Sequence, residues 1–217
     1  MRQYIIRRAA APLPALTGRA FDPGAEPFCG GGYAPIDQYV WPGEYRPEAR
    51  AYAAWDDAGL SVLLCANEPS VIATARDFGG KVWVDSCLEC FLQPFGDDPR
   101  YLNIETNAAG TALIGFGAGR DRRFLAECPP DMDFRASRHE GGWWAVAYRV
   151  PFALIERLYG RRPGPGARMR GNFYACDETI HPHFGSWNPI VSPQPDFHRP
   201  ECFGEIQLAC EDAQASQ

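Results

Sequence analysis

The sequence has no run of Lys or Arg longer than a pair, and its 217 residues carry a net charge of −6. Nucleic-acid binding depends on clustered cations that neutralise phosphates, so we expect no nucleic-acid partner. No stretch of about 18 uncharged apolar residues is present, which is close to the length a membrane helix needs, so we expect no membrane span. Arg7, Arg8, Pro12 and Pro14 interrupt the N-terminal apolar segment, which is therefore a poor signal-peptide core. These absences favour a cytoplasmic protein.

Cysteine, in contrast, is plentiful. A chain of this length with 46% hydrophobic residues does not need disulfides to stabilise its core, so we expect reduced and mostly buried thiols. The segment Cys87–Cys90, CLEC, superficially suggests zinc or redox chemistry. Residues three apart in a strand point to opposite faces, so we predict that these two thiols do not share a metal ion. The eight cysteines are Cys29, Cys65, Cys87, Cys90, Cys128, Cys176, Cys202 and Cys210.

Turn-forming residues divide the chain into short segments, since it has 22 Gly and 20 Pro beside 13% aromatic residues. Residues 56–59 predict the turn of one β-hairpin, and residues 133–138 with 143–150 predict another. Residues 152–159, followed by Gly160, have the apolar spacing of a short surface helix. About ten short strands and one helix predict an all-β fold, an antiparallel β-sandwich or jelly roll.

This fold leaves room for one domain. We expect residues 1–39 to form an N-terminal arm that packs on the domain and residues 40–210 to form the β-sandwich. Residues 211–217 are predicted to be a disordered tail.

Three predicted strands, residues 82–92, 101–107 and 169–176, each have an apolar face and a second, mostly polar face, because side chains alternate across a strand. Amides, carboxylates and a guanidinium can bind the adjacent hydroxyls of a sugar, and indole rings can pack on its C–H face. We interpret the second face as a sugar-binding surface, and the alternative is an ordinary wet surface with cross-strand polar pairs. The second face carries Trp83, Asp85, Cys87, Glu89, Phe91, Tyr101, Asn103, Glu105, Asn107, Arg170, Asn172, Tyr174 and Cys176.

An ordered set of segments then points to a family. The segments are VWVDSCLECFLQPF, YLNIETNAAG, WWAVAYRVPF, RGNFYACDE, HFGSWNPI and PDFHRPECFGEIQL. Over residues 40–210 they resemble the carbohydrate-binding family 9-like domains, which are related to family 9 carbohydrate-binding modules and more distantly to DOMON domains.

The resemblance implies a non-catalytic β-sandwich that holds the end of a sugar chain between two tryptophans. Trp83 and Trp187 fall where those tryptophans are expected, and neither is predicted to be a core residue. At Asn103 the resemblance leads us to expect an arginine. We expect the sugar hydroxyls to contact Asn103, Glu105, Asn107, Arg170 and Asn172, with Tyr174 and His183 at the rim.

Other functions stay open at this point. Glu89 and Glu105 could form the carboxylate pair of a glycosidase, although such pairs are more often structural. A structural or interaction protein that has lost sugar binding is a second alternative, and a haem-binding DOMON-type module that uses His181, His183 and His198 is a third.

No cofactor is predicted. Structural calcium stays an open alternative because carboxylates cluster in two turns, and no metal ligand is assigned. The carboxylates are those of Asp97, Asp98, Asp131 and Asp133.

Overall fold

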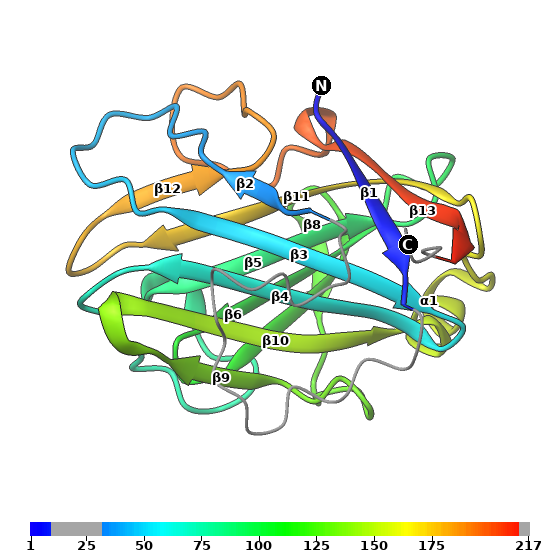
Figure 1. Cartoon of the computed structure of the whole chain (residues 1–217), viewed down its shortest axis with the longest axis horizontal. Coiled ribbons are helices and arrows are strands. Elements are labelled where there is room, and N and C mark those ends of the chain that lie inside the picture. Colours follow the sequence, from blue (N-terminus) through cyan, green and yellow to red (C-terminus); the bar gives the residue numbers. More distant parts are fainter. Residues whose placement is uncertain (10–31, 213–217) are drawn as a thin grey trace, which may run out of the picture.

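The computed structural model describes residues 1–9 and 32–212 (Figure 1). This part of the chain contains one α-helix, α1 (Phe152–Tyr159), three short 3-10 turns, η1 (Val82–Val84), η2 (Glu140–Gly142) and η3 (Pro200–Cys202), and thirteen strands. The strands are β1 (Gln3–Arg8), β2 (Ala34–Ile36), β3 (Ala49–Asp56), β4 (Gly59–Asn67), β5 (Cys87–Gln93), β6 (Tyr101–Asn107), β7 (Ala112–Ala118), β8 (Asp121–Phe124), β9 (Arg135–Arg138), β10 (Trp143–Pro151), β11 (Arg168–Asp177), β12 (His183–Ser186) and β13 (Gly204–Asp212).

All thirteen strands belong to one curled sheet. Its main path runs β8-β7-β6-β5-β11-β13-β1-β3-β4-β10-β9, while β12 pairs with β11 and β2 with β3. The β3, β4 and β10 half lies over the β5 and β6 half (Figure 1). The all-β prediction with one helix is therefore confirmed, as is the two-layered arrangement.

The prediction of a purely antiparallel sheet is wrong because of β1. This strand lies between β13 and β3 and is parallel to both. β13 and β3, the strands on either side of β1, run in the same direction. A strand inserted between them therefore has the same orientation relative to both. Residues 1–39, predicted as an arm, thus contribute β1 and β2 to the sheet, whereas residues 10–31 and 213–217 lie outside the described residues.

The main core lies between the two halves. Leu88 and Ile104 come from one half and Leu64 and Val146 from the other, and all four are fully buried. The predicted hairpins are present as the pairs β3–β4 and β9–β10. The predicted helix is α1, which buries its first turn against this core and ends at Gly160, with a φ of 73°. None of the helices among the described residues is both long and apolar enough to span a membrane.

The segment before β5 differs from the prediction of a strand over residues 82–92. Val82–Val84 is a 3-10 turn, and β5 begins only at Cys87. The cause is Asp85, whose carboxylate accepts hydrogen bonds from the backbone N–H groups of Thr74 and Ala75 at 2.9 and 3.0 Å. These bonds tie the segment to a preceding loop, so the alternation of side chains does not extend back to Trp83.

The second face of β5, β6 and β11 is covered, and the expectation of an open surface is wrong. Phe197 and Phe203, from the segment between β12 and β13, pack on Tyr174 and Phe91, and Trp41, from the loop between β2 and β3, packs on Phe197. Together these rings form a smaller second core. An open cavity is left at one end of this covered face.

Candidate binding site

The cavity has a volume of about 230 Å³ and is open to solvent. Its residues come from η1, β5, β6, β8, β11 and β12, and from the loops before β8, after β11 and before β13. The cavity is lined by Trp83, Glu89, Glu105, Arg120, Arg122, Cys176, Glu178, Phe184, Pro195, Asp196, Phe197 and His198.

Two carboxylates face each other in the wall formed by the sheet. Glu89 on β5 pairs directly with Glu105 on β6, and the two residues are only 2% and 3% exposed. Burial raises the pKa of Glu105 to about 7. Burial, and then repulsion from Glu105, raises the pKa of Glu89 well above its ordinary value. This wall therefore supplies carboxyl groups that can donate as well as accept hydrogen bonds near neutral pH.

Arginine side chains balance these carboxylates. Arg122 on β8 lowers the pKa of both Glu89 and Glu105 through its charge, against the larger effect of burial. Its buried Nε atom has no hydrogen-bond partner among the residues that the structure describes. Arg120, in contrast, forms an ion pair with Asp196 at 2.7 Å. Arg122 is thus the guanidinium that retains a free donor for a ligand.

Aromatic rings form the other walls. Trp83 lies on η1, and Phe184 and Phe197 pack edge to face with ring centroids 6.2 Å apart. Tyr174 stacks on Phe197 at 4.1 Å and donates its hydroxyl hydrogen to the Phe197 carbonyl at 3.1 Å. Because Phe197 is held by both contacts, this wall is rigid.

His198 adds a neutral ring to the cavity. It stacks on Phe91 at 4.9 Å, and its Nδ1 atom lies 2.8 Å from the Tyr101 hydroxyl. Burial, and then the charges of Arg122 and Arg120, lowers the pKa of His198 to about 3. The imidazole is therefore uncharged at neutral pH.

The structure brings only some of the predicted site residues to the cavity. Trp83 and Glu105 line it. Asn103 supports it from below, because its Nδ2 atom donates to Oε1 of Glu105 at 2.8 Å. Tyr174 supports it from behind, through Phe197.

Trp187 is a core residue, and the prediction that it lies outside the core is wrong. It is 2% exposed and packs against Tyr4 and Phe173 at 6.3 and 5.7 Å. Its backbone N–H donates to the Phe173 carbonyl at 2.9 Å, which draws the ring under the sheet beside Gly204. The polar neighbour Asn188 was misleading, since its backbone and side chain are both hydrogen-bonded to the protein.

Three further predicted residues hold loops. Asn107 donates to the Ala75 carbonyl and to Asp85. Asn172 donates to the Asn188 carbonyl and accepts from its N–H. The Arg170 guanidinium donates to the carbonyls of Glu201 and Phe203. None of the three lines the cavity.

His183 lies in a separate buried cluster. Its Nε2 atom is 4.0 Å from Oε2 of Glu68, while His181 stacks on Tyr45 at 4.6 Å. Since His198 is at the cavity, the three histidines do not converge into one ligand group within the described ranges. Of the acidic turn residues, Asp97, Asp98 and Asp133 form ion pairs with Arg161, Arg100 and Arg135.

Sequence reasoning missed Arg122, Phe184 and Phe197, and it considered His198 only as a candidate haem or metal ligand. Arg122 lies on a segment that reads as a strand, DRRF, and its neighbour β7 follows β6 directly, so its position beside Glu105 could have been considered. The other three lie in a Pro-rich segment without periodicity, and no sequence pattern indicates which of its rings face the cavity.

Comparisons with known proteins agree with this architecture. A candidate carbohydrate-binding protein from Bacteroides uniformis is 31% identical, with a TM-score of 0.72 over 82% of this chain and 86% of that chain. A family 9 module from Caldicellulosiruptor kristjanssonii is 14% identical and shares the fold. Its complex with glucose has a TM-score of 0.63 over 100% of both chains, and its complex with cellotriose has 0.65 over 100% of this chain and 98% of that chain. Among curated proteins, none matches the sequence significantly.

The sequence profile of carbohydrate-binding family 9 matches residues 30–208. That range contains every residue that lines the cavity and all the described strands except β1 and the last residues of β13. The match covers most of the chain, and the curled sheet described above is shared with the solved family 9 module. The chain belongs to carbohydrate-binding family 9.

Proposed function

We propose that this protein is a non-catalytic module that binds one sugar unit, a monosaccharide or the end of an oligosaccharide, in the cavity beside Trp83. The observation that carries the proposal is a cavity with aromatic walls on one side and buried hydrogen-bonding groups on the other. Its volume of about 230 Å³ is below the ~300–1,000 Å³ of typical drug-sized pockets. A single pyranose ring is a ligand of suitable size.

The apolar part of the ligand would contact the aromatic rings. The C–H face of a pyranose can lie flat on the indole of Trp83, and its edge can contact Phe184 and Phe197. In this proposal the two phenylalanines take the place that the resemblance gave to Trp187. The rigid support of Phe197 by Tyr174 keeps the ordering cost of binding low.

The hydroxyls of the ligand would contact the sheet and β8. Glu89 and Glu105 accept hydrogen bonds from adjacent hydroxyls, and the guanidinium of Arg122 donates one. In this proposal Arg122 on β8, whose charge acts on both carboxylates, takes the role of the arginine expected at position 103. Asn103 orients Glu105 instead.

A glycosidase is less well supported by the same carboxylates. Hydrolysis needs one carboxyl group that is protonated and one that is ionised, in environments that separate their pKa values. Here burial raises the pKa of both groups, Glu89 and Glu105. Both environments act in the same direction, which suits hydroxyl binding better than acid–base catalysis.

Calorimetric titration with a panel of mono- and disaccharides tests the proposal. Trp83→Ala removes the main stacking surface and should cost roughly 2 kcal/mol or more, about thirtyfold in affinity. Arg122→Met removes a charged donor and should cost about tenfold or more. Trp143→Ala is the matched control, because Trp143 is a partly exposed tryptophan that packs with Arg50 on a different part of the molecule.

Three results would contradict the proposal. If no sugar binds to the wild type at millimolar concentration, the chain is better explained as an interaction protein. If a sugar binds but Trp83→Ala binds it as well as Trp143→Ala does, the binding site lies elsewhere. Release of reducing ends from an oligosaccharide would show that the protein is a hydrolase and not a non-catalytic binding module.

A further inference from the structure

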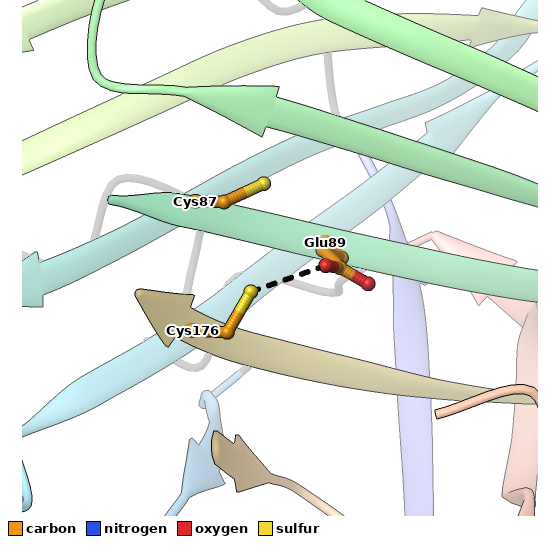
Figure 2. Close-up of side chains that lie close together, drawn as sticks. All are labelled: Cys87, Glu89 and Cys176. Carbon is orange, nitrogen blue, oxygen red and sulfur yellow. Dashed lines mark hydrogen bonds between the residues drawn. The ribbon is translucent and has the colours of Figure 1, made fainter. Parts of the chain in front are cut away.

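Two thiols and a carboxyl group converge beneath the cavity. Cys87 and Glu89 lie on β5 and Cys176 lies on β11, and their ligand atoms are all within 4.8 Å of one another. Figure 2 shows the three side chains gathered on the same side of the two strands. No other group of three such side chains is found in the described part of the chain.

The sheet itself brings these residues together. Cys87 pairs directly with Cys176 in the antiparallel ladder of β5 and β11. Glu89 is two residues further along β5 and therefore on the same face as Cys87. The backbone of two central strands thus fixes all three Cβ positions, and only side-chain rotation is needed to bring the ligand atoms closer.

The three groups are buried and acidic. Cys87, Glu89 and Cys176 are 1%, 2% and 3% exposed, and the Cys176 thiol donates to Oε1 of Glu89 at 3.3 Å (Figure 2). Burial raises the pKa of Cys87 to about 12 and that of Glu89 well above its usual range. Without a cation, the site therefore holds its protons, and a bound divalent cation would replace them.

The donor set selects the type of cation. Two thiolates and one carboxylate form a partly soft set, which suits Zn²⁺ and its thiophilic neighbours, whereas Ca²⁺ and Mg²⁺ take oxygen ligands. Two thiolates and a carboxylate exceed the charge of the ion by one negative charge, and the positive charge of the Arg122 guanidinium acts on Glu89. Glu105, paired with Glu89, and Glu178 in the cavity wall also act on Glu89 through their charges.

Three protein ligands leave one position of a tetrahedral zinc site open. Glu89 and Cys176 both line the cavity, so the open position faces it. A water molecule or a hydroxyl of a bound ligand can reach that position.

We propose that Cys87, Glu89 and Cys176 form a binding site for one thiophilic divalent cation of the zinc class, with a fourth coordination position open to the cavity. The three protons that leave the ligands pass to solvent. The site uses only the first thiol of CLEC, because Cys90 belongs to the main core on the other face of β5.

Cobalt titration of the chelator-treated full chain under a phosphine reductant tests this proposal. Co²⁺ should bind at one ion per chain and give the intense near-ultraviolet absorption of thiolate-to-cobalt charge transfer, and one equivalent of Zn²⁺ should abolish it. Cys87→Ala, Cys176→Ala and Glu89→Gln should each weaken binding at least tenfold, since even residues that only support a metal ligand contribute ~10–100-fold. Cys90→Ala is the matched control and should leave the absorption unchanged.

The expected result is weaker Co²⁺ binding by Cys87→Ala, Cys176→Ala and Glu89→Gln, and unchanged Co²⁺ binding by the control Cys90→Ala. If a thiol variant does not fold by circular dichroism, Cys87→Ser or Cys176→Ser, which keep the volume, replaces it, and Glu89→Gln tests the site independently. The proposal is overturned if Co²⁺ gives no thiolate absorption. It is also overturned if Cys90→Ala loses as much binding as Cys87→Ala, or if reductant-treated protein holds a Cys87–Cys176 disulfide.

Discussion

Gly115 lies directly opposite Asn103 in the pairing of β6 with β7, and a Cβ atom on Gly115 would overlap the amide of Asn103. The missing side chain gives this amide the space in which it donates to Glu105 at 2.8 Å. We expect Gly115→Ala to displace Asn103 and to weaken sugar binding roughly two- to tenfold, the value of one hydrogen bond.

The measurement for Gly115→Ala is calorimetric titration with whichever sugar binds the wild type. Gly96→Ala is the control, because a Cβ atom there meets nothing within 4 Å. Equal affinities for the two variants would show that the Asn103–Glu105 contact does not matter for binding.

The two tryptophans of the family pattern should respond differently to truncation. Trp187→Ala leaves a large cavity in the main core and should lower the free energy of unfolding by about 3–5 kcal/mol. Trp83 is partly exposed, so Trp83→Ala should cost less than half as much. Urea unfolding measures both, at an unchanged slope with urea concentration. A smaller loss for Trp187→Ala than for Trp83→Ala would mean that Trp187 is not a core residue.

Asn172 should act on stability and not on sugar affinity. Its side chain is buried, and Asn172→Ala leaves both the N–H and the carbonyl of Asn188 without their partner. Unsatisfied buried groups cost about 1–3 kcal/mol, so we expect a loss of that size in urea unfolding. Sugar affinity of the folded variant should stay within twofold of the wild type. A large loss of sugar affinity without a loss of stability would show that Asn172 contacts the sugar, as the sequence predicted.

Glu68 should make stability fall as the pH rises. It is 3% exposed, and burial raises its pKa from 4.5 to about 7, although the Trp144 indole N–H donates to it. The folded state then binds the proton more tightly than the unfolded state, so the contribution is full below pH 4.5 and is lost as the pH rises through 7. The wild type should lose about 2–3 kcal/mol through this group between pH 5 and pH 8.

Urea unfolding of wild type and Glu68→Gln at a series of pH values isolates this effect. The difference in the free energy of unfolding between the two proteins should change by about 2–3 kcal/mol between pH 5 and pH 8. Over this range Glu68→Gln should become more stable relative to the wild type. Parallel curves would show that Glu68 has a similar pKa in both states.

The alternation of side chains along a strand correctly predicted which residues of β5, β6 and β11 share a face, because this alternation is a local property of each strand. It could not reveal that Phe197 and Phe203 cover that face, since loop placement depends on tertiary contacts. The same rule correctly separates Cys87 from Cys90. It also places Cys87 and Cys176 on the second face, but the direct pairing of these two strands is not written in the sequence.

The prediction for Trp187 failed for a related reason. The neighbours in the chain, Ser186 and Asn188, are polar and suggested an exposed loop. Their polar groups form hydrogen bonds inside the protein, so the segment passes through the interior without leaving a buried polar group unpaired. The parallel orientation of β1 was equally inaccessible, because six residues that alternate in exposure fit either direction.

The position of β1 governs when the protein can complete its fold. Gln3 is paired with Glu205, so β1 leaves the ribosome long before its partner strand β13 does. Until β13 emerges, β1 can pair only along β3, and the far side of β1 remains an open edge of the kind that recruits other chains. Closure between such distant segments is slow on topological grounds. During synthesis this edge therefore stays unpaired for a long interval, and added chaperone capacity should raise the soluble yield of the protein.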